Sequence, residues 1–131
     1  MTELQLGIEV YVILNFIVIG LSHVLQPKAW VDFFIRLRGM GYTGVFANSF
    51  LSLIFGSIIV SFHNVWTGIP AVITAIGWAQ VLKATIGFTV PAVSMRGLNR
   101  VSHERAWEFR VAGGIFLALT GLLAYGLLRA A

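Results

Sequence analysis

Four long apolar segments alternate with polar connections along this chain of 131 residues. Each segment has about 20 residues, the length that an α-helix needs to cross roughly 30 Å of bilayer hydrocarbon. The segments cover residues 4–25, 44–62, 69–90 and 111–128. The pattern therefore predicts an all-α, integral membrane four-helix bundle that forms a single transmembrane domain, residues 1–131.

The connection between the first two segments has its own periodicity. In residues 28–38, apolar side chains at Trp30, Phe33, Phe34 and Leu37 recur with helical spacing, and most charged side chains lie elsewhere. This spacing predicts a short amphipathic helix in the membrane plane, with its aromatic side chains toward lipid and its cations toward anionic headgroups. The alternative is that the helix covers the end of the bundle.

Composition and charge support the membrane interpretation. The chain is 58% hydrophobic and 11% charged, whereas soluble domains are about 25% charged. The net charge of +4 does not indicate a nucleic-acid partner, because seven of the nine basic residues lie in the first and third connections. They are Lys28, Arg36, Arg38, Arg96, Arg100, Arg105 and Arg110. The positive-inside rule places both connections in the cytoplasm, and hence both termini outside it, in a multi-pass protein of the cell inner membrane.

Several polar side chains fall inside the apolar segments. A lysine within hydrocarbon costs roughly 2.5 to 3.5 kcal/mol on insertion scales, so Lys83 needs a partner, a route to the surface or a function. Helical rise puts Asn48 and Lys83 at similar depths, about 10 and 12 Å from the cytoplasmic surface, and predicts a hydrogen bond between them. The intramembrane polar candidates are Glu9, Asn15, Asn48, Gln80 and Lys83.

A second polar group is expected at the outer surface. His63 ends the second segment there, Asn64 and Trp66 follow it, and Glu9 lies near the same surface in the first segment. A contact between Glu9 and His63 is geometrically possible and would lower the cost of both groups. The alternative for Glu9 is a partly hydrated carboxylate at the interface, and Trp66 is expected to anchor at the headgroups.

Small residues at helical spacing predict close contacts between helices. They form one face on each of the last three segments: Ser49, Ser52, Gly56, Gly77, Ala84, Gly87, Gly114, Ala118 and Gly121. Residues 44–56 and 114–126 also share glycine and phenylalanine positions. This weak repeat is consistent with two helical hairpins related by a pseudo-two-fold axis along the membrane normal.

No pattern of catalytic residues accompanies these features. The chain lacks a GxSxG elbow, an HExxH pair and a glycine-rich phosphate loop, and its lack of cysteine excludes thiolate chemistry. His63 is expected about 30 Å from His23 and His103. The latter two make only a weak alternative as a metal or haem site, because further ligands are missing. We expect no catalytic residues, metal, haem or other cofactor.

The run HNVW at residues 63–66, GW at 77–78 and LK at 82–83 resembles a pattern in small bacterial integral membrane proteins of unknown function. In that pattern a glycine often follows the lysine, whereas Ala84 follows it here. The resemblance covers about a sixth of the chain. It implies a small bacterial membrane protein and no activity, substrate or site.

Two functions are consistent with the sequence. The first is a non-enzymatic structural or accessory subunit, partnered by membrane lipids and by other membrane subunits or further copies of itself. The second is a small transporter of a solute, an ion or protons that uses the intramembrane polar residues. A haem-dependent or lipid-modifying membrane enzyme is the least supported alternative.

Overall fold

A computed structural model describes residues 1–130. Its long helices are α1 (Glu3–Leu25), α3 (Tyr42–Phe62), α4 (Pro70–Thr89) and α6 (Trp107–Ala130), and its short elements are α2 (Pro27–Gly39), α5 (Pro91–Asn99) and the 3₁₀ turn η1 (His103–Arg105). Four helices are long and apolar enough to cross a membrane, the last of them counted with η1. The predicted all-α fold with four membrane spans is confirmed.

Proline residues determine where the short helices begin. Pro27 and Pro91 occupy the first turns of α2 and α5, where a missing N–H group costs nothing. Proline also disfavours helical geometry in the residue before it, so α1 ends at Leu25 and α4 ends at Thr89. The helix predicted for residues 28–38 is therefore present as α2, while α5 is a second short helix within the third connection.

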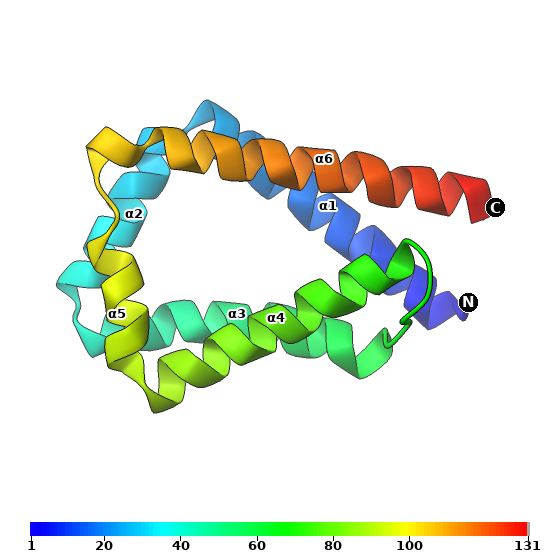
Figure 1. Ribbon diagram of the computed structural model, residues 1–131, viewed down its shortest axis with the longest axis horizontal. Coiled ribbons are helices and arrows are strands. Elements are labelled where there is room, and N and C mark those ends of the chain that lie inside the picture. Colours follow the sequence, from blue (N-terminus) through cyan, green and yellow to red (C-terminus); the bar gives the residue numbers. More distant parts are fainter. Residues whose placement is uncertain (131) are drawn as a thin grey trace.

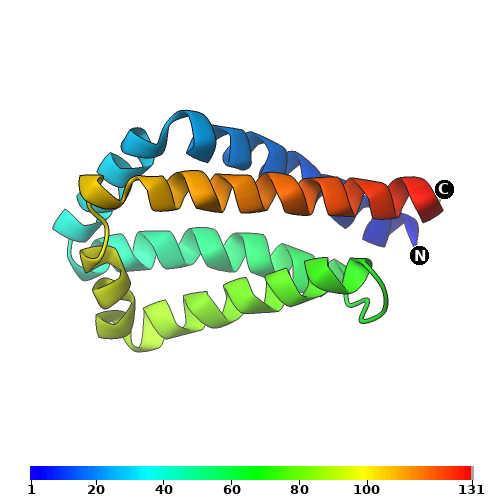
Figure 2. The same ribbon diagram turned by 45° about the horizontal axis from the view of Figure 1, so that its top comes forward.

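The long helices form two close pairs (Figures 1 and 2), in which α1 packs along α6 and α3 packs along α4. The pairs meet near the chain ends and the loop of residues 63–69, which we call the loop end. They separate toward α2 and α5, which we call the basic end. The consecutive helices α1 and α3 do not form a close hairpin, because α2 lies across the basic end between them.

The order long helix, proline-initiated short helix, long helix occurs twice, first as α1 to α3 and then as α4 to α6. Each close pair contains one helix from each half of the chain. The two predicted hairpins are thus replaced by pairs formed between the halves.

Glycines allow the two helices of each pair to approach closely. A Cβ atom added at Gly113 would lie 2.7 Å from the carbonyl oxygen of Gly20, and one at Gly56 would lie 2.7 Å from that of Gly77. The predicted small face of α3 and α4 is buried, and its members are Ser49, Ser52, Gly56, Gly77, Ala84 and Gly87. Such contacts gain dispersion energy where lipid supplies no hydrophobic driving force.

The predicted α6 face differs from the one that packs. Gly113 and Thr120 are buried against the bundle, whereas Gly114, Ala118 and Gly121 are exposed on the outer side of α6. The two stripes are offset by one residue, which corresponds to about 100° around the helix. Both stripes of small residues are present in the sequence, and the stripe that includes Gly113 is the one that packs against α1.

An apolar core joins the two pairs at the loop end. Three of its buried residues come from α1 and one from each of the other long helices: Ile8, Val12, Phe16, Ile59, Ile73 and Leu123. Aromatic rings extend it toward the basic end, since Phe16 stacks on Phe116 with ring centroids 5.1 Å apart.

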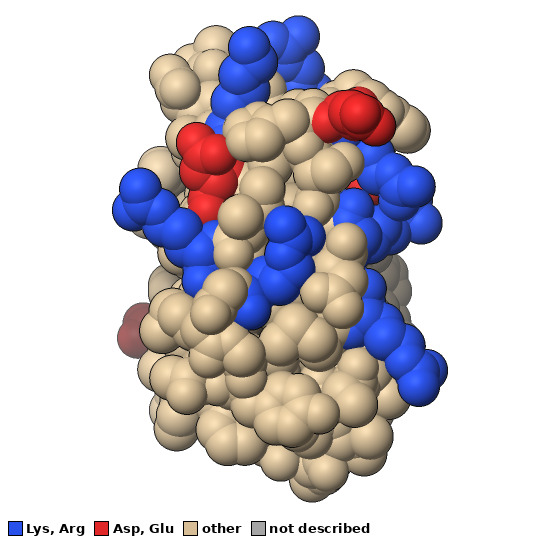
Figure 3. All heavy atoms as spheres, turned by 90° about the vertical axis from the view of Figure 1, so that its left-hand side faces the viewer, with Lys and Arg blue, Asp and Glu red and all other residues tan. Residues whose placement is uncertain are grey.

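The basic end is held together by side chains of α2. The Arg38 guanidinium donates hydrogen bonds to the carbonyl oxygens of Leu98 (3.2 Å) and Val101 (2.9 Å), which ties α2 to α5 and the segment after it. Lysine and arginine side chains gather on this face (Figure 3). The two basic connections therefore lie at the same end of the molecule.

The aromatic face of α2 does not point uniformly away from the protein. Trp30 donates from Nε1 to Ser22 Oγ (2.8 Å) and stacks on His23, and Phe34 stacks on Phe109, while Phe33 is 39% exposed. The contacts of Trp30 and Phe34 match the alternative interpretation, in which α2 covers the end of the bundle.

Candidate functional site

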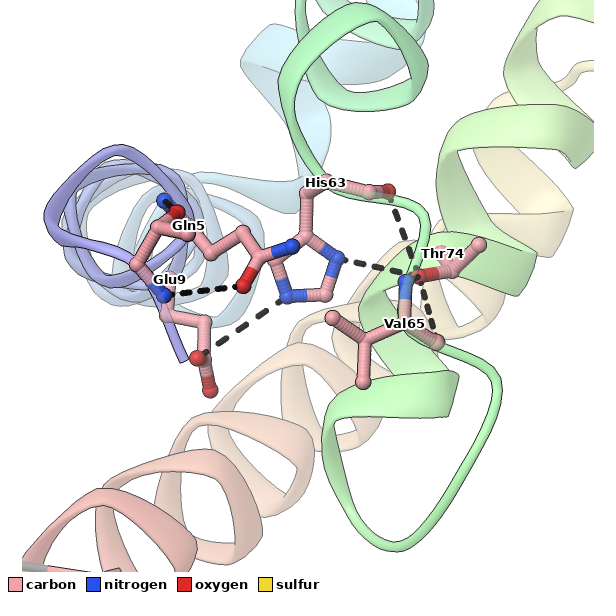
Figure 4. Close-up of polar contacts among 6 residues, drawn as sticks. Gln5, Glu9, His63, Val65 and Thr74 are labelled. Carbon is pink, nitrogen blue, oxygen red and sulfur yellow. Dashed lines mark hydrogen bonds and ion pairs between the residues drawn. The ribbon is translucent and has the colours of Figure 1, made fainter.

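The expected contact between Glu9 and His63 is present at the loop end. His63 Nε2 lies 3.8 Å from Glu9 Oε2, and the two side chains are 0% and 2% exposed. Glu9 comes from α1, one turn after Gln5, and His63 directly follows α3 (Figure 4). The pair therefore connects two long helices that otherwise make few contacts.

Thr74 of α4 holds the imidazole of His63 in place. Its hydroxyl group lies 2.8 Å from the carbonyl oxygen of Val65 and accepts from the Val65 N–H group at 3.1 Å. His63 Nδ1 lies 2.9 Å from the same oxygen. The single hydroxyl proton is used toward a carbonyl oxygen, so Nδ1 must be the donor in its contact with Thr74.

This arrangement determines the chemistry of His63 Nε2. With the proton on Nδ1, the neutral imidazole presents a lone pair at Nε2, and Nε2 faces Glu9. Burial lowers the pKa of His63 below its ordinary value, because the charged imidazolium loses its hydration. The neutral ring is thus the favoured form when no proton donor faces it.

Two buried atoms in the described part of the chain have no hydrogen-bond partner, and they are Glu9 Oε2 and His63 Nε2. An unpartnered buried polar atom is costly and rare in native structures. Here the two face each other at a distance slightly too long for a hydrogen bond. A proton between Glu9 Oε2 and His63 Nε2 would give each of these atoms a hydrogen-bond partner.

A pocket of about 380 Å³ reaches Glu9 from the loop end. Met1, Ile69, Gly126 and Arg129 are among the residues that line it. Glu9 is only 2% exposed, but it borders a space at this end of the molecule, while the apolar core closes the other side.

The remaining intramembrane polar residues do not join this site. Asn15 donates to the carbonyl oxygen of Tyr11 in its own helix (2.8 Å), and Gln80 is half-buried with its Cβ beside Gly56. Within residues 1–130, no hydrogen bond links Asn48 to Lys83, so the expected bond is not formed. The Lys83 side chain is instead exposed.

The direction of Lys83 follows from its spacing. It lies seven residues after Ile76, hence on nearly the same helical face, and Ile76 packs against the core shared with α1 and α6. Asn48 likewise lies seven residues before Phe55, whose ring contacts Tyr11 and Phe16 of α1. Both positions therefore lie on the helix faces that meet the core nearer the loop end, with Lys83 exposed and Asn48 half-buried.

The expected outer-surface cluster divides in two. His63 points inward to Glu9, whereas Asn64 accepts a hydrogen bond from Trp78 Nε1 (3.1 Å) and Trp66 is 61% exposed. An exposed tryptophan at the end of a span is typical of a membrane interface.

The other two histidines have separate partners. His23 Nδ1 contacts the carbonyl oxygen of Ile19, and His103 pairs with Asp32 at the surface. No group of three histidine or acidic side chains suited to a metal ion is found among residues 1–130.

His23 also lines a pocket of about 300 Å³ at the basic end, with Phe34, Arg100, Arg105 and Phe116 among its other walls. Beside it, Arg100 pairs with Glu108 at 2.8 Å, and this hydrogen bond raises the pKa of Arg100.

These features define a four-span membrane protein with a buried acid–imidazole pair at one end. Comparison with known proteins adds no identification, because no family model, curated protein or solved structure matches the chain.

Proposed function

We propose that this protein is a non-enzymatic structural subunit in a bacterial inner membrane. It assembles with further copies of itself through the outer face of α6. The observation that carries the proposal is the exposed stripe of Gly114, Ala118 and Gly121. A Cβ atom added at Gly114 or Gly121 would meet no atom within 4 Å. The helix backbone is thus open to close approach along about two turns.

Within the chain, glycines at similar positions are used for helix contacts. Gly20 meets Gly113, and Gly56 meets Gly77, so within each pair the two helices are already held together by a close glycine contact. A second copy is the simplest occupant of the remaining stripe. Two copies related by a two-fold axis along the membrane normal would bring the stripe against itself in an isologous interface.

The orientation in the membrane is part of the proposal. The two basic connections share one end of the molecule, and the positive-inside rule assigns that end to the cytoplasm. The cations can then contact anionic headgroups of the inner leaflet, and both chain ends face the opposite side.

The oligomeric state of the purified protein in lipid nanodiscs tests the assembly. We expect a dimer or larger oligomer for the wild type, and monomers for Gly114→Ile and Gly121→Ile, because a branched side chain keeps the helices apart. Gly7→Ile is the matched control, since Gly7 is also exposed with open space around it and has no small residue one turn away. A monomeric wild type, or variants that assemble normally, would contradict the proposal.

A transport function is the second candidate, favoured by the placement of Asn48 and Lys83 on the helix faces that meet the core nearer the loop end. The apolar core separates these residues from Glu9 and His63, so the polar groups form no continuous path in this conformation. Proton or ion flux into liposomes that depends on Lys83, with assembly unchanged in Lys83→Met, would favour transport over the subunit role.

A further inference from the structure

We propose that Glu9 and His63 form a proton-binding site, in which one proton lies between Glu9 Oε2 and His63 Nε2 and exchanges with water at the loop end. When the proton binds, the carboxylate becomes a carboxyl group that donates to the Nε2 lone pair. When it leaves, the proton passes to water through the pocket and the carboxylate is restored. This site is independent of the proposed assembly through α6.

Hydrogen bonding around Thr74 determines how many protons can lie between Glu9 Oε2 and His63 Nε2. Because the Thr74 hydroxyl group donates to the carbonyl oxygen of Val65, Nδ1 is assigned as the donor toward Thr74, and the neutral ring can only accept at Nε2. An ionised Glu9 also only accepts, so without a proton the two acceptors would face each other at 3.8 Å in a buried setting. One proton on either atom converts the pair into a donor and an acceptor. A second proton would place two donors face to face.

The pair is shielded from solvent, and few charged groups surround it. The side chains are almost completely buried, and Thr74, the α4 residue bound to His63, is neutral. The charged groups on the accessible side are Met1, if its amine is free, and Arg129 of α6, which line the pocket with Glu9. These cations oppose the binding of a metal ion more strongly than that of one proton. The described chain also supplies no third ligand.

Occupancy by the proton has a structural consequence. The pair connects α1 to the start of the loop at His63, and Thr74 connects that loop to α4. Release of the proton replaces an attraction at this junction with a repulsion. The contact of α1 with the other helix pair at the loop end is therefore sensitive to the proton concentration on that side.

Nitrogen-15 NMR of the histidine-labelled full-length protein tests the site directly. In the wild type we expect His63 Nδ1 to stay protonated and Nε2 to report a change when the proton leaves Glu9 as the pH is raised. In Glu9→Gln the amide group donates to Nε2 permanently, so this transition should disappear. A His63 ring protonated on Nε2 alone, or the same transition in Glu9→Gln, would overturn the proposal.

Carbodiimide labelling provides a test in the wild-type protein that does not depend on a variant folding. Dicyclohexylcarbodiimide reacts with protonated carboxyl groups in apolar surroundings, and the exposed Glu3 of the same helix is the internal control. At neutral pH we expect Glu9 to be modified at least tenfold faster than Glu3, with a rate that falls as the pH rises. Equal rates for the two residues, or an unmodified Glu9, would show that the proton is absent.

Discussion

At the scale of single residues, the hydroxyl group of Thr74 organises the loop end. One oxygen atom contacts the ring of His63 and both backbone polar groups of Val65. It thereby fixes the tautomer of His63 and the path of the loop between α3 and α4. Removing this oxygen leaves the buried Nδ1 of His63 and the part-buried backbone groups of Val65 without this partner.

We therefore expect Thr74→Val to lower the free energy of unfolding by about 1–3 kcal/mol, the cost of unsatisfied buried polar groups. Thr85→Val is the matched control, because the exposed Thr85 hydroxyl bonds only to Val81 of its own helix. Reversible unfolding in mixed micelles measures both. Equal effects of the two substitutions would show that the Thr74 contacts contribute nothing.

The pH dependence of stability follows from His63. Its pKa is lowered in the folded protein, so the stabilising neutral form is fully populated above about pH 6.5, the ordinary histidine pKa. Below that pH the unfolded chain takes up a proton that the folded chain does not. We expect Glu9→Gln, in which His63 titrates without Glu9, to lose stability as the pH falls below 6.5. Unfolding measured from pH 8 to pH 5 checks the sign, and a gain in stability on acidification would contradict it.

The contact between Glu9 and His63 could be predicted from the sequence. Glu9 lies near the start of the first apolar segment and His63 follows the end of the second, so helical rise places both near the same membrane surface. The role of Thr74 could not be predicted, since a threonine in an apolar helix usually bonds to its own backbone. Asn48 and Lys83 were expected to bond because helical rise places them at similar depths, but depth alone did not determine which helix faces would meet.

At the scale of elements, glycine positions decide which helix faces touch. On α6, the stripes through Gly113 and Gly114 are both rich in small residues, and only the first packs against α1. The position of every long helix in the chain could be predicted from the sequence, but the rotation of α6 about its own axis could not. That rotation depends on which neighbour the helix meets.

Substitution of Gly113 tests this contact. In Gly113→Val the new side chain would clash with Gly20 and with the Cβ of His23, both within 2.8 Å of the added Cβ position. We expect a loss of about 1–3 kcal/mol, typical of overpacking. Gly7→Val is the control, because nothing lies within 4 Å of that position. Thermal unfolding in detergent distinguishes the two, and an equally stable Gly113→Val would show that α1 and α6 are not in close contact.

At the scale of the whole molecule, two helix pairs joined by an apolar core span the membrane, with short helices across one end. The number of spans and the location of both basic connections at one end could be predicted from hydropathy and charge. The pairing of α1 with α6 and of α3 with α4 could not, because it depends on contacts between residues far apart in the chain.

The central claim is that four helices cross the membrane and place both basic connections on one face and the loop between α3 and α4 on the other. Since the chain has no cysteine, single cysteines at Arg36, Arg105 and Thr67 can be labelled in intact cells with a membrane-impermeant maleimide. We predict that Thr67→Cys reacts, whereas Arg36→Cys and Arg105→Cys react only after the membrane is opened. Different accessibility of the cysteines at positions 36 and 105 would contradict the claim.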